Sequence, residues 1–204
     1  MAKIRACGTT SELKIRLRVK PNKVLECVIE SVNIPKNKVL ENAYTYKDKF
    51  MAQLEMLGEF ERLDIIIDSR GGSLDSAWGL VDALYAMPGK ARVLIDGQCG
   101  SAATMIPAGI KGPVFITERS SVYIHGPQAA SNDRGGKIFA LYQRFAKKWN
   151  KKMMVKFYRT RIKKPRKTIR QWMENGTRFS PKEAVEIGFC DGIMSRYEFE
   201  RCRK

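Results

Sequence analysis

A serine at position 101 is placed where its hydroxyl could act as a nucleophile. An apolar run at 91–96 predicts a buried strand that stops at Gly97, and small residues compatible with a helix begin at Ser101. A strand, a tight turn and a helix would hold the hydroxyl at a helix N-terminus, where unpaired backbone N–H groups suit a developing oxyanion. The alternative is that Ser101 is only an N-cap, because serine favours that position. Cys99, inside the predicted turn, is a second candidate nucleophile that we rank below Ser101.

Two other segments end predicted strands with residues suited to the same chemistry. Gly71 and Gly72 follow a predicted strand at 63–68, and His125, the single histidine, follows one at 121–124. Sites in α/β sheets form beyond the carboxyl ends of adjacent strands, and a Gly-Gly turn lets the backbone approach a substrate with a free N–H. The parts needed for acyl transfer are then Ser101 as nucleophile, His125 as base, and the N–H groups of Gly72 and Ala102 as oxyanion donors.

The elements that must position these residues alternate between helix and strand. Near-continuous apolar strands between amphipathic helices predict an α/β fold with a largely parallel sheet, preceded by a basic hairpin. A Ser-Pro-Lys-Glu sequence at 180–183 is a strong helix start. The predicted strands are 13–19, 24–29, 63–68, 91–96, 114–117, 121–124 and 189–194, and the main predicted helices are 42–62, 74–87, 101–109, 138–158, 167–173 and 180–188.

Composition limits the function classes. The 204 residues carry a formal net charge of +17, which favours nucleic acid, acidic proteins or anionic surfaces as partners. No apolar run could span a bilayer and no signal core follows the basic N-terminus, so we expect a protein kept in the cytoplasm, away from membranes. Five cysteines without zinc spacing and one histidine predict no metal site and no cofactor. Without a phosphate-binding loop, any ATPase would be another chain.

Four motifs, in this order along the chain, resemble those of the Clp protease proteolytic subunit (ClpP) family. The Ser-Ala-Ala-Thr residues are closest to the phage head-maturation protease branch of that family. The four motifs are Asp-Ser-Arg-Gly-Gly-Ser at 68–73, Gly-Gln-Cys-Gly-Ser-Ala-Ala at 97–103, Tyr-Ile-His-Gly-Pro at 123–127 and Phe-Ser-Pro-Lys-Glu-Ala-Val at 179–185. The resemblance covers roughly 45–195. It implies a ClpP/crotonase-type βαβ superhelical fold, with an N-terminal region at 1–40, a peptidase domain at 41–204 and a protruding handle helix at about 128–160.

The same resemblance implies a function and an assembly. Carried over by motif, Ser101 is the nucleophile, His125 the base, and Gly72 and Ala102 form the oxyanion hole. The implied protein is a serine endopeptidase that cleaves polypeptides inside a ring of six or seven subunits, served by an ATP-driven unfoldase.

Two departures from the family pattern are visible. Arg70 stands where the family has proline, and Gly176 aligns with the acidic residue that completes the triad. Asn175 and Glu174 lie beside that position, whereas Asp191 matches a family position that we interpret as structural. The orienting group for His125 is therefore unassigned. This leaves a second hypothesis, a catalytically weak or inactive ring subunit.

A third hypothesis comes from a basic stretch between Lys147 and Arg170, which holds twelve lysines and arginines and no Asp or Glu. Like charges at helical spacing repel, so a nucleic acid or an acidic partner should compensate them. Trp149, Phe157 and Tyr158 interleave the charges and could stack on a single strand, although helical spacing equally suits the core. We interpret the aromatic stripe Phe139, Tyr142, Phe145 and Trp149 as packing or an oligomer contact.

Overall fold

A computed structural model describes residues 9–20, 24–35, 43–57, 59–85, 91–127 and 137–202. One sheet runs in the order β1-β2-β3-β4-β5-β8, and β6 branches from β4 and pairs with β7. From β2 to β8 the pairings are parallel, and β1–β2 and β6–β7 are antiparallel. The α/β prediction is confirmed. The strands are β1 (Thr9–Val19), β2 (Val24–Pro35), β3 (Arg62–Ser69), β4 (Ala91–Gly100), β5 (Val114–Ile116), β6 (Ser121–Ile124), β7 (Thr177–Phe179) and β8 (Gly192–Ile193).

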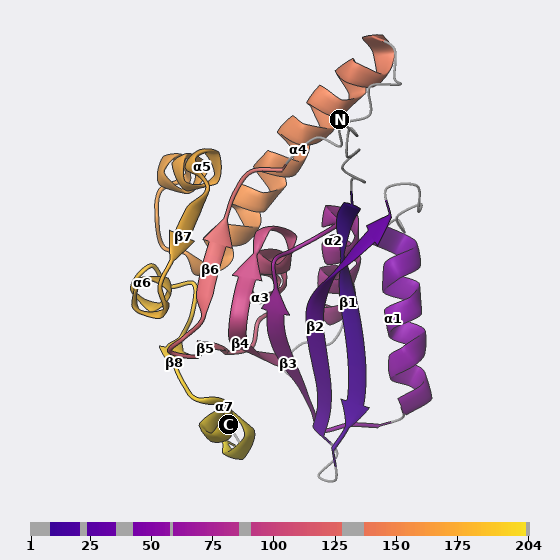
Figure 1. Ribbon diagram of the computed structural model, residues 1–204, viewed down its shortest axis with the longest axis vertical. Helices are drawn as coiled ribbons and strands as arrows, with labels where there is room; N and C mark the ends of the chain where they lie inside the picture. Colours follow the sequence, from indigo (N-terminus) through magenta and orange to yellow (C-terminus); the bar gives the residue numbers. More distant parts are fainter. Residues whose placement is uncertain are drawn as a thin grey trace, which may run out of the picture.

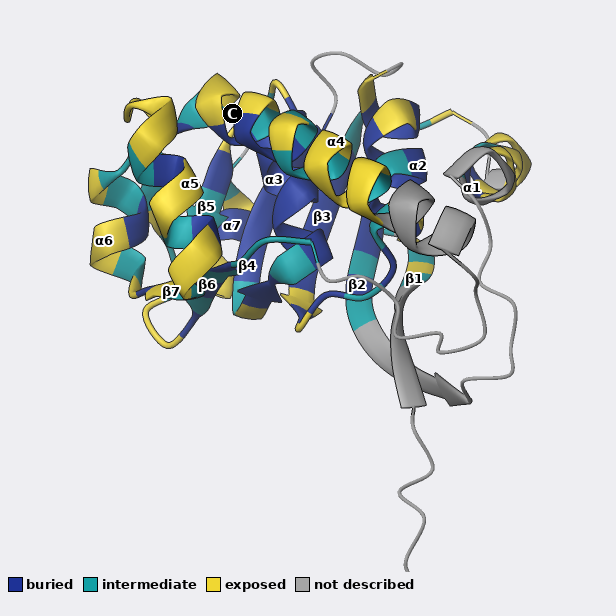
Figure 2. Ribbon diagram, turned by 90° about the horizontal axis from the view of Figure 1, so that it is seen from above, coloured by how far each residue is buried: buried dark blue, intermediate teal, exposed yellow. Residues whose placement is uncertain are grey.

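Helices cover both faces of the central strands (Figure 1). Ile65 and Ile67 of β3 point to a large core shared with α1, α2 and α3, whereas Ile66 packs with Phe199 of α7 on the opposite face. Figure 2 shows the buried strands β3 and β4 beneath α2, α3 and α4; α2 and α4 have exposed outward faces, whereas α3 is buried throughout. The helices are α1 (Ala43–Leu57), α2 (Leu74–Tyr85), η1 (Ser101–Thr104, a 3-10 turn), α3 (Met105–Gly109), α4 (Lys137–Arg161), α5 (Arg166–Asn175), α6 (Pro181–Glu186) and α7 (Arg196–Arg201).

The N-terminal hairpin is confirmed, and it forms one edge of the sheet. Its first strand pairs with β2 over eleven positions, from Thr9 opposite Pro35 to Val19 opposite Leu25. The predicted turn residues Pro21 and Asn22 lie outside the described residues. Because β2 continues into a parallel pairing with β3, the hairpin is joined to the strands that carry the site.

The prediction that the strand stops at Gly97 is wrong, because β4 continues to Gly100. The β3–β4 register changes from Ile67 opposite Ile95 to Ser69 opposite Cys99, so β4 carries a bulge. Gly97 lies in this bulge at φ 134°, a conformation that favours glycine, and the Asp68 carboxylate occupies the space a Cβ would need. After the bulge, β4 exchanges its neighbour β5 for β6. The glycine therefore redirects the strand toward the site.

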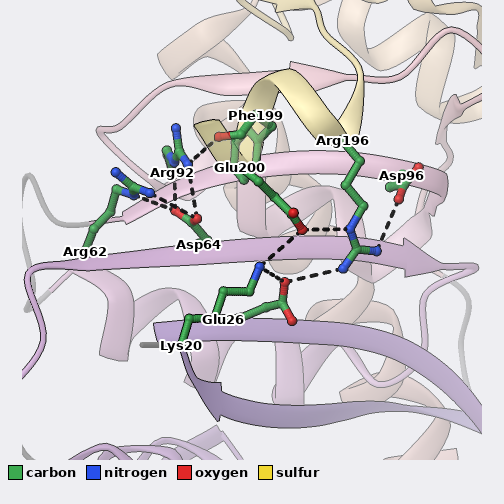
Figure 3. A network of polar contacts seen from close by, with 9 residues as sticks. All are labelled: Lys20, Glu26, Arg62, Asp64, Arg92, Asp96, Arg196, Phe199 and Glu200. Atoms are coloured by element: carbon green, nitrogen blue, oxygen red, sulfur yellow. Dashed lines mark hydrogen bonds and ion pairs between the residues drawn. The ribbon is translucent and has the colours of Figure 1, made fainter. Parts of the chain in front are cut away.

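A buried ion pair holds the C-terminal helix α7 on the sheet (Figure 3). The Arg92 guanidinium, 2% exposed, donates to both carboxylate oxygens of Asp64 at 2.7 and 3.1 Å. It also donates to the carbonyl oxygens of Phe199 and Cys202, at 2.6 and 2.8 Å. The guanidinium also lies over the Phe199 ring, 4.0 Å from the ring centroid. One buried cation thus stabilises a short helix that has little stability of its own.

Two short elements were not predicted, and one predicted strand is shorter. Strand β7 and helix α7 have no expectation from the sequence, and β8 covers only two residues of the predicted 189–194. The Ser180 capping box is confirmed, since Ser180 Oγ accepts from Glu183 N–H and the Glu183 carboxylate accepts from Ser180 N–H. Among the helices in the described ranges, none combines the length and apolar character that crossing a bilayer requires.

Candidate active site

Ser101 begins the 3-10 turn directly after β4, in a strained backbone conformation. Its φ of 53° makes it the one residue other than glycine with a positive φ in the described part of the chain. Such strain costs roughly 1–3 kcal/mol and clusters at functional sites. The N-cap of the turn is Gly100, without a side-chain capping bond, so the N-cap interpretation of Ser101 is wrong. The hydroxyl is half-buried and is not used for capping.

Helix α4 anchors this strained turn through Tyr158. The Thr104 hydroxyl donates to the Ser101 carbonyl oxygen, so Tyr158 must donate its own proton to Thr104 Oγ1, 2.6 Å away. Complete burial raises the pKa of Tyr158 and keeps that proton in place. Tyr158 is therefore a positioning residue for the serine turn.

The loop after β3 packs directly on Ser101. A Cβ added to Gly71 would lie 2.6 Å from Ser101 Cβ, 2.6 Å from the Gly100 carbonyl oxygen and 3.0 Å from Ala102 N. Gly71 also has a φ of 104°, so the close approach and the backbone conformation both require glycine. The contact brings the Gly-Gly loop and the serine turn against each other.

The predicted oxyanion donors belong to these two segments. The Gly71 N–H donates to Ser69 Oγ at 3.1 Å, whereas the Gly72 N–H has no acceptor among the residues that the structure describes. The Ala102 N–H lies in the first turn of η1, where backbone donors lack an intrahelical acceptor. The predicted oxyanion donors therefore lie on two segments in contact.

His125 follows the strand that pairs with the end of β4. Gly100 pairs with Tyr123 in the parallel β4–β6 ladder, so Ser101 and His125 both lie just beyond the carboxyl ends of neighbouring strands. Within the described ranges no hydrogen bond joins Ser101 Oγ to the imidazole. Catalytic hydrogen bonds are often long before substrate binds and tighten in the Michaelis complex.

The Nδ1 atom of the His125 imidazole faces a backbone carbonyl. His125 Nδ1 lies 2.7 Å from the Gly126 oxygen, and since a carbonyl only accepts, Nδ1 carries the proton. In the neutral imidazole with this tautomer, Nε2 carries the free lone pair and can act as a base. The Gly126 N–H in turn donates to the Met173 carbonyl at 2.7 Å, which attaches this turn to α5.

None of the acidic or amide candidates occupies that orienting position. Glu174 forms an ion pair with Lys151, and this hydrogen bond and charge lower the pKa of its carboxyl. Asn175 and Gly176 line a cavity of about 410 Å³ beside His125, without a hydrogen bond to the ring in the described chain. Asp191 accepts from the Val114 N–H at 2.7 Å and from Arg161 at 3.0 Å, in agreement with a structural role.

The alternative thiol nucleophile is unfavourable. Cys99 is completely buried in β4, not in a turn, and burial raises the pKa of its thiol well above the ordinary value. A thiol must ionise and be accessible to attack a substrate. The geometry therefore favours Ser101 over Cys99. Among the described side chains, His, Cys, Asp and Glu form no group of three or more that could hold a metal ion.

The Clp protease family model matches residues 34–197. The chain belongs to the Clp protease family. Proteolytic subunit 2 of the ATP-dependent Clp protease of Frankia casuarinae is 24% identical over 140 residues, 68% of this chain and 64% of that protein. The match thus spans less than two thirds of the Frankia protein.

Two chlamydial relatives in the family align over more of their length. Proteolytic subunit 1 of Chlamydia caviae is 24% identical over 147 residues, 71% of this chain and 76% of that protein. Subunit 1 of Chlamydia trachomatis serovar D is 23% identical over 158 residues, 76% of this chain and 82% of that protein. Membership assigns the chain to a serine peptidase family with the α/β fold described above, while the phage head-maturation branch stays a prediction.

Two tyrosines were not assigned to the candidate active site from the sequence. Tyr158 supports the serine turn, and Tyr123 lies with its ring centroid 5.3 Å from that of His125. A Cβ on Gly176 would lie 2.7 Å from the Tyr123 hydroxyl, so this hydroxyl fills the space beside the position where the family has its acid. Gly176 was the sequence signal that could have indicated Tyr123, because a residue without a side chain leaves room for a neighbouring side chain.

The aromatic side chains of α4 differ in how far they are buried. Tyr158 is in the core, and Phe157 packs edge-on against Trp78 with centroids 4.7 Å apart, so neither is available for stacking. Trp149 and Phe145 are 59% and 65% exposed, which rules out packing within the described chain for these two. The side chains of Phe139 and Tyr142 lie outside the described residues.

Proposed function

We propose that this chain is a serine endopeptidase of the ClpP type, with Ser101 as nucleophile and His125 as general base. One observation supports this most strongly. A serine in a strained left-handed conformation directly follows β4, which pairs with the strand that leads into His125, and the Gly71 backbone packs against this serine. A strained serine next to a histidine and free backbone donors is the arrangement that acyl transfer requires.

The proposed reaction has two steps. Ser101 Oγ attacks the scissile carbonyl carbon while its proton passes to His125 Nε2, and the oxyanion accepts hydrogen bonds from the N–H groups of Gly72 and Ala102. When the C–N bond breaks, the imidazolium returns the proton to the leaving amine. Water then attacks the acyl-enzyme, again with His125 as base, and releases the acid product.

The Gly126 carbonyl would take the orienting part that a carboxylate has in a Ser-His-Asp triad. It fixes the Nδ1–H tautomer, but it stabilises the imidazolium less than a negative charge would. We therefore expect a slower enzyme with unchanged chemistry. The alternative is an inactive subunit that has a structural role in a ring.

We further propose assembly into rings of six or seven subunits and cooperation with an ATP-driven unfoldase. The relatives are named as proteolytic subunits of ATP-dependent proteases, which supports both parts. Phe145 and Trp149, exposed on the helix that projects from the sheet in Figure 1, are suited to a subunit contact. Light scattering and native mass spectrometry would measure the subunit number.

A second candidate function is single-stranded nucleic acid binding along α4. From 137 to 175 the single acidic residue is Glu174, and exposed Trp149 lies among the cations of this face. Such binding would weaken steeply with salt, because phosphate contacts release counterions. An oligonucleotide titration at two salt concentrations tests it, and absent or salt-insensitive binding would remove this candidate.

The peptidase proposal is tested by hydrolysis of an unfolded protein such as casein and of fluorogenic peptides. Wild-type protein should cleave them, Ser101→Ala should not, and Cys99→Ser should retain the activity that Ser101→Ala loses. Equal turnover in wild type and Ser101→Ala would contradict the proposal. A folded wild type without turnover would favour the inactive ring subunit.

A further inference from the structure

Two cavities flank the proposed catalytic pair, and Tyr123 lines both of them. The cavity beside the serine turn has a volume of about 390 Å³ and is bounded by the backbone at Gly100 together with Arg70 and Arg178. The cavity beside His125 has a volume of about 410 Å³ and takes Lys147 and Lys151 from α4. We name the two cavities together the cationic cleft.

We propose that the cationic cleft selects polypeptide segments with Asp or Glu side chains beside the scissile bond. This inference rests on the proposed peptidase function, because it names the substrate class of the same site. The shared Tyr123 makes the two cavities neighbours, so an extended peptide across the site would contact both.

The serine-side cavity carries two guanidinium groups without a carboxylate. Arg178 donates to Ser121 Oγ at 2.7 Å and lies over the Tyr123 ring, 5.3 Å from its centroid, so its charge is positioned but not neutralised. Arg70 is exposed in the loop that packs on the serine turn. Neither pairs with an acidic side chain among the residues that the structure describes.

The histidine-side cavity is also positive overall. Its one carboxylate, Glu174, is paired with Lys151, which leaves Lys147 without an acidic partner in the described chain. The two cavities together therefore hold Arg70, Arg178 and Lys147 as unneutralised cations. A cleft lined by one sign of charge concentrates ligands of the opposite sign.

A polypeptide fits the cleft better than another polyanion does. The unpaired backbone donors at Gly72 and Ala102 are suited to a carbonyl, and the Gly71 backbone lies against the serine turn. Carboxylate side chains on either side of a bound peptide bond could then reach guanidinium groups, which bind carboxylates in a bidentate geometry.

The test uses matched fluorogenic peptides that differ only by Glu or Gln around the cleavage site. At low salt we expect kcat/KM to favour the Glu peptide by about tenfold, the size of a few exposed charge pairs. Arg70→Gln combined with Lys147→Gln should bring the ratio close to one. Arg119→Gln combined with Lys182→Gln removes the same charge from exposed positions outside the cleft and should keep the ratio.

A parallel measurement separates this inference from the peptidase proposal. Fluorescence anisotropy follows binding of the same Glu and Gln peptides to Ser101→Ala. Charge-selective binding without cleavage by wild type would contradict the peptidase proposal and keep the cleft's selectivity. Cleavage with equal kcat/KM for both peptides, or loss of selectivity in the outside control, would overturn the inference. Displacement of the Glu peptide from the cleft by an oligonucleotide at lower concentration would overturn it as well.

Discussion

Replacing Gly176 by Asp in a Tyr123→Phe background should raise kcat about tenfold. Position 176 is where the family has its acid, and the turn holding it lines the cavity beside His125. The tyrosine change is needed because a Cβ at 176 would lie 2.7 Å from the Tyr123 hydroxyl. The backbone at 176 has φ 66°, a conformation that Asp and Asn tolerate better than most residues, at a cost of about 1 kcal/mol of stability.

The expected magnitude comes from the orienting hydrogen bond of His125. The neutral Gly126 carbonyl already selects the correct tautomer, so the added carboxylate contributes only its charge. Hydrogen bonds to charged groups contribute about 1–1.5 kcal/mol more than neutral ones, which is about tenfold in rate. A nearby carboxylate also raises the pKa of an imidazole, so the acid limb of the pH–rate profile should move to higher pH.

The assay is steady-state hydrolysis of a fluorogenic peptide from pH 5 to 9, with thermal melting as the check on folding. Tyr123→Phe alone and Tyr123→Phe with Gly176→Asn are the controls, since Asn offers the same shape without the charge. Equal kcat and the same acid limb in the folded Asp and Asn variants would contradict the proposal that a missing negative charge beside His125 limits the rate.

Three further predictions concern the supporting structure. Gly71→Ala should lower kcat/KM by about a hundredfold, because φ 104° and a 2.6 Å approach to the Gly100 carbonyl oxygen force the loop away from the serine turn; unchanged kinetics would contradict that packing. Arg92→Ala should lower the free energy of unfolding in urea by about 3–5 kcal/mol, because the Phe199 and Cys202 carbonyls lose a buried donor and Asp64 is left with Arg62 as its partner; a loss under 1 kcal/mol would contradict this role. Burial raises the pKa of Cys190 to about 12 and raises that of Cys99 well above the ordinary thiol value, so neither should react with iodoacetamide at pH 8 before urea is added; peptide mass spectrometry would detect native-state labelling, the opposite result.

Much of the fold followed from local patterns in the sequence. The alternating hairpin strands, the apolar β3 and the capping box at Ser180 each carry their signal within a few residues. The extension of β4 through Gly97 could not be predicted, because a glycine that permits a bulge looks the same as one that ends a strand. Helix α7 was missed although Ser195 and Glu198 form a capping box at its start, a local signal that the sequence does offer. Its anchoring to the sheet by Arg92, more than a hundred positions away in the chain, has no such local signal.

The sequence predicted the main residues of the candidate site, but not the groups that position them. The order of the motifs indicated Ser101, His125 and the glycine loop, and parallel pairing of β4 with β6 explains why distant motifs meet. The acceptor at His125 Nδ1 is a backbone carbonyl, and every residue has one, so no residue type could indicate it. Helical spacing placed Tyr158 in the core, but this pattern does not show whether its hydroxyl also hydrogen-bonds to Thr104 of the serine turn.

The nucleophile is most directly tested by mass spectrometry after reaction with a fluorophosphonate. Wild-type protein should gain one adduct, mapped to Ser101, and His125→Ala should gain it far more slowly because the base is gone. Ser101→Ala should gain none. A folded wild type that stays unlabelled, or an adduct that persists in Ser101→Ala, would contradict the assignment of Ser101 as the nucleophile.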